Sequence, residues 1–227
     1  GLNADFVASG KQMNFGDRHI GEFNLDISLR RETKDALSVS ASGTINDIWL
    51  SQGLRFDTIS GQARNAPEGY NFSIDVQREH DKRPTQLTLL GSARFDGDYP
   101  NGQLEMDGTL LGEPIKSQSP ITWRLGDTPA VDLNLLVLDG LIKADVEQEK
   151  NDARLTFKID KLSLEPVLAA MGLAAPDAVI SGGGDLYLFG DNPRGQFVIA
   201  ANGPLPGVEE TFALDITGRL GNGKLVL

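Results

Sequence analysis

Apolar and polar residues alternate along most of this chain. The alternation is clearest at 23–29, 37–45 and 70–76, where an apolar residue or a glycine occupies every second position. Successive side chains of a strand point to opposite faces, so each stretch predicts a half-buried strand with one wet face. Further strands are expected at 86–95, 103–111, 119–125, 130–138, 141–148, 153–160, 185–189, 196–202 and 210–218. Short polar turns between them predict an all-β, mostly antiparallel meander.

A short phrase, two alternating apolar residues followed by a glycine, recurs through the chain. It reads Val39-Ala41-Gly43, Leu87-Leu89-Gly91, Leu104-Met106-Gly108, Leu136-Leu138-Gly140, Leu186-Leu188-Gly190, Ile199-Ala201-Gly203 and Leu214-Ile216-Gly218. The glycine is expected to supply a bend, a turn or a weakly packed strand end. Repetition of one strand pair is typical of a surface or a conduit and provides no reaction centre.

One segment has helical spacing instead. The apolar residues between 163 and 171 recur three or four positions apart, with Ser163 as a candidate N-cap, Pro166 in the first turn and Gly172 as a C-terminal stop. We expect a helix of about two turns here, either packed on the sheet or serving as a gate or contact point along a groove. The glycines at 182–184 are expected to link this helix to the next strand.

Composition limits the choice of partner and of metal site, but the absence of cysteine does not fix the compartment. The 227 residues include 21 basic and 32 acidic side chains, and the net charge of -11 disfavours nucleic acid or an anionic membrane surface as a direct partner. No cysteine is present, which excludes disulfides and thiolate metal sites. No apolar run is long enough to span a bilayer. We interpret 1–227 as a single repetitive β segment of a larger protein, with a possible subdivision near 126–130.

Candidate catalytic and metal-binding residues are few. The two histidines, His19 and His80, lie among charged neighbours without partners at metal-ligand spacing. Asp96-Gly97-Asp98 is expected to be a turn and not a calcium loop. Glu105 and Asp107 fall on the wet face of a predicted strand, and paired acids need a cleft to act. We therefore expect no enzyme activity, no cofactor and no metal.

A sheet with one apolar face must hide that face. A closed sandwich or barrel would do so with protein alone, whereas a long sheet rolled into a U would leave an apolar trough for a ligand. Each buried methylene contributes about 0.8 kcal/mol, so an acyl chain of about sixteen carbons would gain on the order of 10 kcal/mol. Aliphatic lining without convergent polar groups would hold such chains without fixing their position.

The stretch 153–173 resembles the strand, "Leu-x-Leu-x-Pro", short helix and glycine phrase of the TamB and AsmA-like family, through Leu162, Leu164 and Pro166. The stretch 180–190 is similar to that family's recurring "Ser-Gly, strand, Gly" phrase. The resemblance covers about 130–220 and extends in rhythm only over 1–130. It implies a periplasmic, inner-membrane-anchored protein of a Gram-negative bacterium, folded as a long U-shaped β-taco with an apolar interior.

Members of this family are associated with phospholipid movement to the outer membrane and, through a barrel partner, with outer-membrane protein assembly. On this interpretation the groove would conduct phospholipid acyl chains, and the barrel partner would be reached through parts outside this segment. Strand parity then predicts the groove lining. The predicted lipid-binding residues are Phe23, Leu25, Ile27, Leu87, Leu89, Leu104, Met106, Leu133, Leu135, Phe157, Ile159, Leu186, Leu188, Phe197 and Ile199.

Two other functions fit the same pattern. A scaffold or chaperone could bind strands of outer-membrane proteins by edge pairing. A closed-core structural module could instead bury the apolar face internally. Exposed apolar ends also predict end-to-end self-association of this segment.

Overall fold

The alternation of the sequence produces a single large sheet in the computed structural model, which describes residues 3–16, 18–31, 37–51, 54–78, 83–96, 99–149, 152–170, 177–188, 194–204, 211–221 and 224–226. The strands are β1 (Asn3–Phe15), β2 (Arg18–Arg31), β3 (Leu37–Ser51), β4 (Leu54–Ala66), β5 (Gly69–Arg78), β6 (Thr85–Asp96), β7 (Tyr99–Leu110), β8 (Glu113–Ser117), β9 (Ile121–Arg124), β10 (Ala130–Val137), β11 (Gly140–Glu149), β12 (Asp152–Ser163), β13 (Val179–Leu188), β14 (Arg194–Pro204), β15 (Thr211–Gly221) and β16 (Lys224–Val226). The helix α1 (Glu165–Ala170) follows β12.

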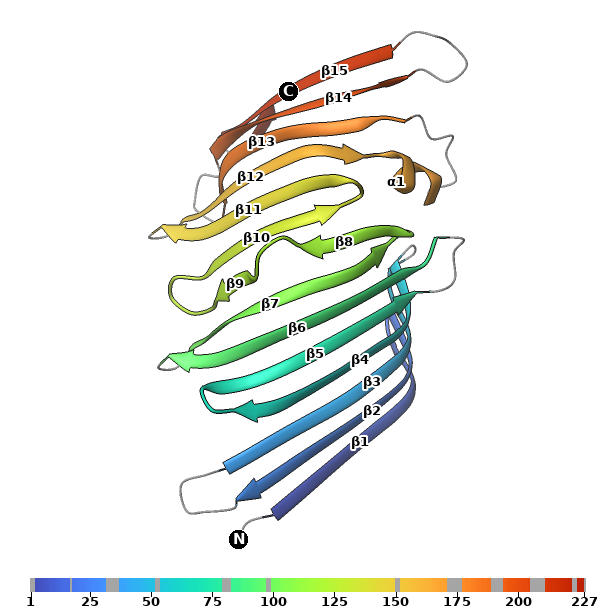
Figure 1. Cartoon of the computed structure of the whole chain (residues 1–227), viewed down its shortest axis with the longest axis vertical. Coiled ribbons are helices and arrows are strands. Elements are labelled where there is room, and N and C mark those ends of the chain that lie inside the picture. The colour runs from blue at the N-terminus through green and yellow to red at the C-terminus, as the bar shows by residue number, and fades with distance from the viewer. Residues whose placement is uncertain are drawn as a thin grey trace.

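The sixteen described strands form one antiparallel meander, in which strands follow one another across the sheet in chain order (Figure 1). The exception is β8 and β9, which share one strand position because both pair with β7 on one side and β10 on the other. The buried Ser117 hydroxyl accepts a hydrogen bond from the Met106 amide and donates one to the Met106 carbonyl at this interruption. The sheet therefore continues without a break from β1 to β16.

The predicted all-β meander and the predicted helix are both confirmed. The prediction that the glycines at 182–184 link the helix to a strand is wrong, because they lie inside β13 and pair with β12 and β14. The sequence analysis did not single out β4 or β8. Strand β4 alternates weakly, with Gly61 and Ala63 at core-facing positions, and β8 has only five residues.

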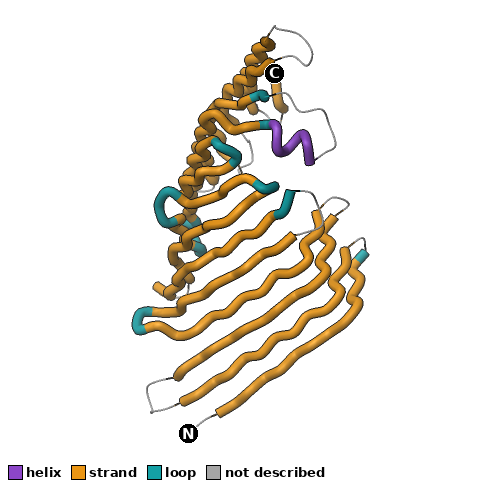
Figure 2. The backbone as a smooth tube through the Cα atoms, turned by 45° about the vertical axis from the view of Figure 1, so that its right-hand side comes forward, coloured by secondary structure: helices purple, strands orange, loops and turns teal. Residues whose placement is uncertain are grey.

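Strands β1 to β4 turn sharply near one end (Figure 2). The turn coincides with a backbone irregularity, since Gln12 in β1 and Asp47 in β3 have left-handed φ values of 51° and 54°. Gly21 of β2 lies at the same level, and a Cβ atom there would lie 2.8 Å from Cβ of Asp47. Only glycine fits so close to a neighbouring strand. The described strands thus form a bent, twisted single sheet, and closure into a U-shaped groove stays a prediction.

Candidate functional site: an uncovered apolar face

Strand pairing places all fifteen residues of the predicted lining on one face of the sheet. Directly opposed residues of an antiparallel pair share a face, so the face can be followed from strand to strand. Leu104, for example, is opposed to Gly91 of β6 and to Ile121 of β9. We call this surface the apolar face. Its role in lipid binding stays a prediction, and the side chain of Leu188 lies outside the described residues.

The opposite side of the sheet, the polar face, carries hydroxyl, amide and carboxylate side chains. One of its rows runs across β2 to β6 as Asn24, Thr44, Ser60, Asp75 and Thr88. Within this row the Thr88 hydroxyl donates to the Asp75 carboxylate over 2.7 Å. The apolar residues at the alternate positions of the same strands lie on the other face.

Little of the apolar face is covered by the described chain. Among the described residues, six apolar side chains are buried and no large side chain is fully buried. The accessible surface is 14737 Å², whereas a compact monomer of 24.4 kDa would expose about 10,000 Å². Several apolar-face residues are therefore half exposed, among them Leu25, which is 37% exposed, and Leu214, which is 51% exposed. The excess surface is what a single layer without a second layer produces.

Aromatic rings on the apolar face lie over glycines of the neighbouring strand. In each case the glycine is directly opposed to the aromatic residue, and a Cβ atom at the glycine would overlap the ring. The pairs are Gly10 with Phe23, Gly91 with Phe72, Gly102 with Trp123, Gly184 with Phe157 and Gly218 with Phe197. Covering glycine with an aromatic ring compensates for the side chain that glycine lacks. Each ring therefore occupies space beside a glycine that a side chain would otherwise fill.

Helix α1 covers one margin of the apolar face (Figure 1). There the buried side chains of Ile115, Val137 and Leu138 form a small core, and Val167 of the helix packs against them. Arg83, between β5 and β6, holds the helix by two hydrogen bonds to the Glu165 carboxylate, at 2.6 and 3.1 Å. The bonds to Glu165 raise the pKa of Arg83. The ion pair therefore joins the connection before β6 to the helix, 82 residues farther along the chain.

Carboxylates on the polar face occupy two different environments. The Arg154 guanidinium donates hydrogen bonds to Asp185, the shortest of 2.6 Å, and these bonds lower the pKa of Asp185. Burial raises the pKa of Asp145, and the nearby carboxylates of Glu147 and Asp132 raise it further. Burial together with these like-charged neighbours accounts for the raised pKa of Asp145 in structural terms.

The residues weighed for catalysis or metal binding do not converge in the part of the chain that the structure describes. No group of three or more histidine, cysteine, aspartate or glutamate side chains there is arranged to hold a metal. His19 contacts the Asn14 side chain at 2.8 Å and lies 3.8 Å from the Asp47 carboxylate. His80 and residues 97–98 of the predicted Asp-Gly-Asp turn lie outside the described residues. The expectation that the protein is not an enzyme stays a prediction.

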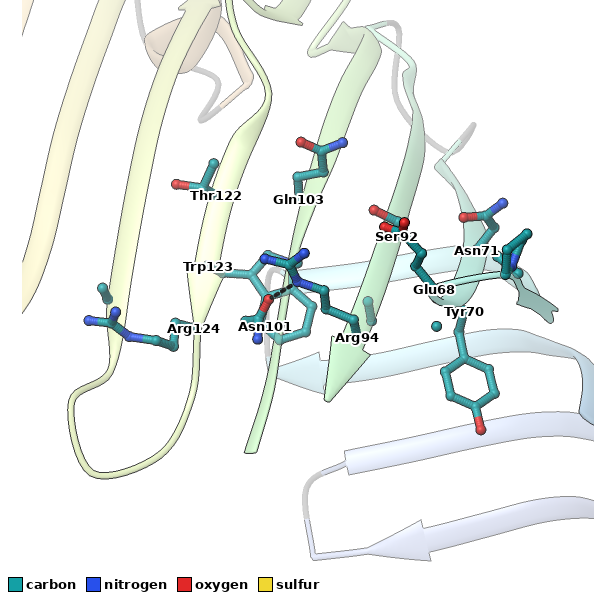
Figure 3. Close-up of a pocket in the computed structure, with 16 residues that line it drawn as sticks. Glu68, Tyr70, Asn71, Ser92, Arg94, Asn101, Gln103, Thr122, Trp123 and Arg124 are labelled. Atoms are coloured by element: carbon teal, nitrogen blue, oxygen red, sulfur yellow. Dashed lines mark hydrogen bonds between the residues drawn. The ribbon is translucent and has the colours of Figure 1, made fainter. Parts of the chain in front are cut away.

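Two hollows in the described part of the sheet are lined mainly by polar-face positions. The smaller, of about 240 Å³, lies over β2 to β5. The larger, of about 900 Å³, lies near one end of strands β4 to β10 and is called the polar hollow here (Figure 3). Ser92, Gln103 and Thr122 are opposed to one another along its wall. A twisted sheet is saddle-shaped, so each face is concave in one direction.

One feature of the polar face was missed by the sequence analysis. Strand pairing brings four arginines into a continuous row near one end of β6 to β14, which we call the arginine row. Its members in order are Arg94, Asn101, Arg124, Ala130, Glu147, Arg154, Tyr187 and Arg194. A signal existed in the sequence, since Arg94, Arg124 and Arg154 are thirty residues apart.

None of the described helices is both long enough and apolar enough to cross a membrane. Comparison of the chain with protein-family models, curated proteins and solved structures found no match.

Proposed function

We propose that this chain is a segment of a TamB or AsmA-like intermembrane lipid-transport protein, in which phospholipid acyl chains move along the apolar face. The observation that carries the proposal is a continuous apolar face that the described chain leaves largely uncovered. Exposed apolar surface on this scale normally marks a site that another molecule covers.

Free energy favours an acyl chain as that molecule. Each methylene transferred from water contributes about 0.8 kcal/mol, so a chain of about sixteen carbons would gain roughly 10 kcal/mol at full burial and less on an open face. The lining supports apolar contact without fixed orientation, because residues such as Leu104, Met106 and Leu133 carry no hydrogen-bonding group. Ligands held in this way can slide.

The length of the apolar face favours a conduit over a pocket for a single ligand. The apolar face crosses fifteen strand positions, which at about 4.8 Å per strand corresponds to roughly 65 Å. One acyl chain extends about 15 Å, half of a hydrocarbon core of about 30 Å. Several chains therefore fit in succession, as transport between two membranes would need. The proposed setting is the periplasm of a Gram-negative bacterium, with the inner-membrane anchor and the outer-membrane barrel partner reached through other parts of the protein.

The test is native mass spectrometry of the purified chain, with extraction and identification of bound lipid. Leu104→Asp places a carboxylate on the apolar face between Gly91 and Ile121, and we expect it to reduce lipid occupancy at least tenfold. Glu105→Lys is the matched control, because Glu105 is exposed on the polar face of the same strand. Equal occupancy in the two variants, or a stable lipid-free wild type, would refute the proposal.

A second candidate function is edge pairing with strands of outer-membrane proteins. Strand β1 has one neighbour, β2, among the described strands, and Phe6 and Val7 on it are 57% and 75% exposed. A long, exposed, apolar edge strand is a template for another strand. Photo-crosslinking from Val7 to an unfolded barrel hairpin would support this function, and its absence at saturating hairpin would exclude it. The closed-core alternative has less support, because the described strands form one layer.

A further inference from the structure

We propose that a phospholipid bound at the middle of the apolar face lies along the strands, with its headgroup beside Tyr70 and Trp123 and its acyl chains directed toward helix α1. This inference rests on the proposed function and deepens it, because it assigns a direction to the bound lipid. The aliphatic middle of the face does not orient a lipid. The orientation comes from a difference in chemistry between the two ends of the same strands.

One end of the middle strands carries aromatic side chains on the apolar face. Tyr70 of β5 is opposed to Ala93 of β6. Gly102 of β7 is opposed to Ala93 on one side and to Trp123 of β9 on the other, so Tyr70 and Trp123 share one row. The ring of Phe95 lies edge-on to the Tyr70 ring, with 6.4 Å between the ring centroids. We call Tyr70, Phe95 and Trp123 the aromatic margin.

The aromatic margin lies at a boundary between apolar surface and water. Phe95 is 59% exposed. In the part of the chain that the structure describes, the Tyr70 hydroxyl and the Trp123 indole N–H have no hydrogen-bond partner, and neither is among the buried atoms that lack one, so both reach solvent. Tyrosine and tryptophan favour the boundary between lipid chains and water, because each combines a large apolar ring with one hydrogen-bonding group. The aromatic margin therefore suits the junction of an acyl chain and its headgroup.

The opposite end of these strands is aliphatic and covered. Figure 1 shows α1 at the other end of the strands from the turn between β9 and β10. Ile115 and Val137 are only 6% and 4% exposed there, and they form the small core with Leu138 against which Val167 of the helix packs. Leu87 of β6, a predicted lining residue, packs against the same core. None of these side chains forms hydrogen bonds, so this end suits methyl and methylene groups.

Backbone geometry holds α1 at this end. The chain leaves β12 through a bulge at Lys161, whose φ is 54°. The Ser163 amide then donates a hydrogen bond to the Leu138 carbonyl over 2.9 Å, and the Leu164 amide donates one to the Ala178 carbonyl over 2.8 Å. Together with the ion pair to the connection before β6, these bonds make the helix a fixed barrier to a chain that extends along the strands.

The distance between the two ends matches the length of an acyl chain. Leu87 and Ala93 are six residues apart on β6, which at about 3.3 Å per residue corresponds to roughly 20 Å. An acyl chain extends about 15 Å, half of a hydrocarbon core of about 30 Å, which leaves room for the glycerol group at the aromatic margin. The reverse orientation would place a polar headgroup against the covered aliphatic core, where it would lose its hydrogen bonds to water.

Tryptophan fluorescence tests this orientation, because a doxyl group quenches a nearby indole and is available at either end of an acyl chain. The chain has two tryptophans, so Trp49→Phe leaves Trp123 as a single reporter at the aromatic margin. The variant is incubated with vesicles of phosphatidylcholine that carries doxyl at carbon 5 or at carbon 16 of one acyl chain, and is then separated from the vesicles by flotation. We expect the carbon-5 label to quench Trp123 at least twofold more strongly than the carbon-16 label.

A second reporter examines the end beside α1. Leu87→Trp, combined with Trp49→Phe and Trp123→Phe, places an indole there, and Gly108 directly opposite has no side chain in its way. The order of quenching should reverse, with the carbon-16 label the stronger. The Trp123 reporter does not depend on this substitution. Glu105→Trp in the same background is the matched control, because Glu105 is exposed on the polar face, and we expect little quenching by either label.

The outcomes separate this inference from the proposed function. Bound lipid that quenches Trp123 equally with both labels, or more strongly with the carbon-16 label, would overturn the orientation and leave the proposed function standing. A protein that carries no lipid after flotation and shows no quenching at any reporter would refute the proposed function, and the orientation would fall with it. Quenching of Glu105→Trp as strong as that of Trp123 would show that the lipid is not confined to the apolar face and would overturn both.

Discussion

Replacement of Gly218 by alanine tests whether aromatic rings shape the apolar face. A Cβ atom on Gly218 would approach three ring atoms of Phe197 to less than 3.0 Å, whereas ordinary contact begins near 3.4 Å. All three atoms belong to the ring, so the clash is relieved when the ring moves away from β15. The backbone does not have to shift, which makes the effect specific to the ring.

The expected change in the free energy of unfolding follows from the apolar area that the Phe197 ring would expose. A buried phenylalanine covers roughly 150–250 Å², and loss of about half at about 25 cal/mol per Å² costs about 2–3 kcal/mol. Alanine in a strand is itself favoured over glycine by about 0.5–1 kcal/mol. The net expectation for Gly218→Ala is a loss of about 1–2 kcal/mol. Gly61→Ala is the matched control, since its Cβ atom would meet no ring among its nearest neighbours, of which the Ser73 carbonyl oxygen is nearest at 3.3 Å, and we expect it to change stability less than Gly218→Ala does.

Urea unfolding followed by far-ultraviolet circular dichroism measures both variants, with Phe197→Leu added to complete a double-mutant cycle. If the ring causes the loss, Gly218→Ala should cost little in the Phe197→Leu background. Equal shifts for Gly218→Ala and Gly61→Ala, or no coupling between Gly218 and Phe197, would refute the reasoning.

Three further predictions concern charged groups. Burial raises the pKa of Asp145, so its carboxylate opposes folding at pH values above its ordinary pKa of 3.8. Asp145→Asn should therefore raise the urea midpoint of unfolding at pH 7. At a pH below 3.8 the variant and the wild type should unfold at similar urea concentrations. Hydrogen bonds from Arg154 lower the pKa of Asp185, so its carboxylate stabilises the fold at pH values above its ordinary pKa of 3.8. Asp185→Asn should therefore lower the urea midpoint of unfolding at pH 7 but not at low pH. Equal midpoint shifts at both pH values in either variant would contradict these assignments. Arg83→Gln should release the helix from Glu165, with faster amide exchange in α1 and only a small loss of global stability, since the pair is partly exposed. Unchanged exchange in α1 would show that apolar packing alone holds the helix.

The pairing of alternate residues into faces was predictable because a strand has a side-chain period of two. Leu104 and Met106 must share a face once the chain is extended, whatever lies beside them. Spacing also predicted α1, because apolar residues three and four positions apart fit a helix and not a strand. Strand β8 was harder to predict, since five residues including Pro114 give little alternation.

By itself, the sequence determined that this protein has strands with one apolar and one polar side, because alternation is local. Only the tertiary structure decided which strands meet and in what register. That register places Gly218 beneath Phe197 and brings Arg94, Asn101 and Arg124 into one row. Register depends on loop lengths, on bulges and on the backbone irregularities at Gln12 and Asp47. These effects add up over many residues, so no short sequence motif encodes the register.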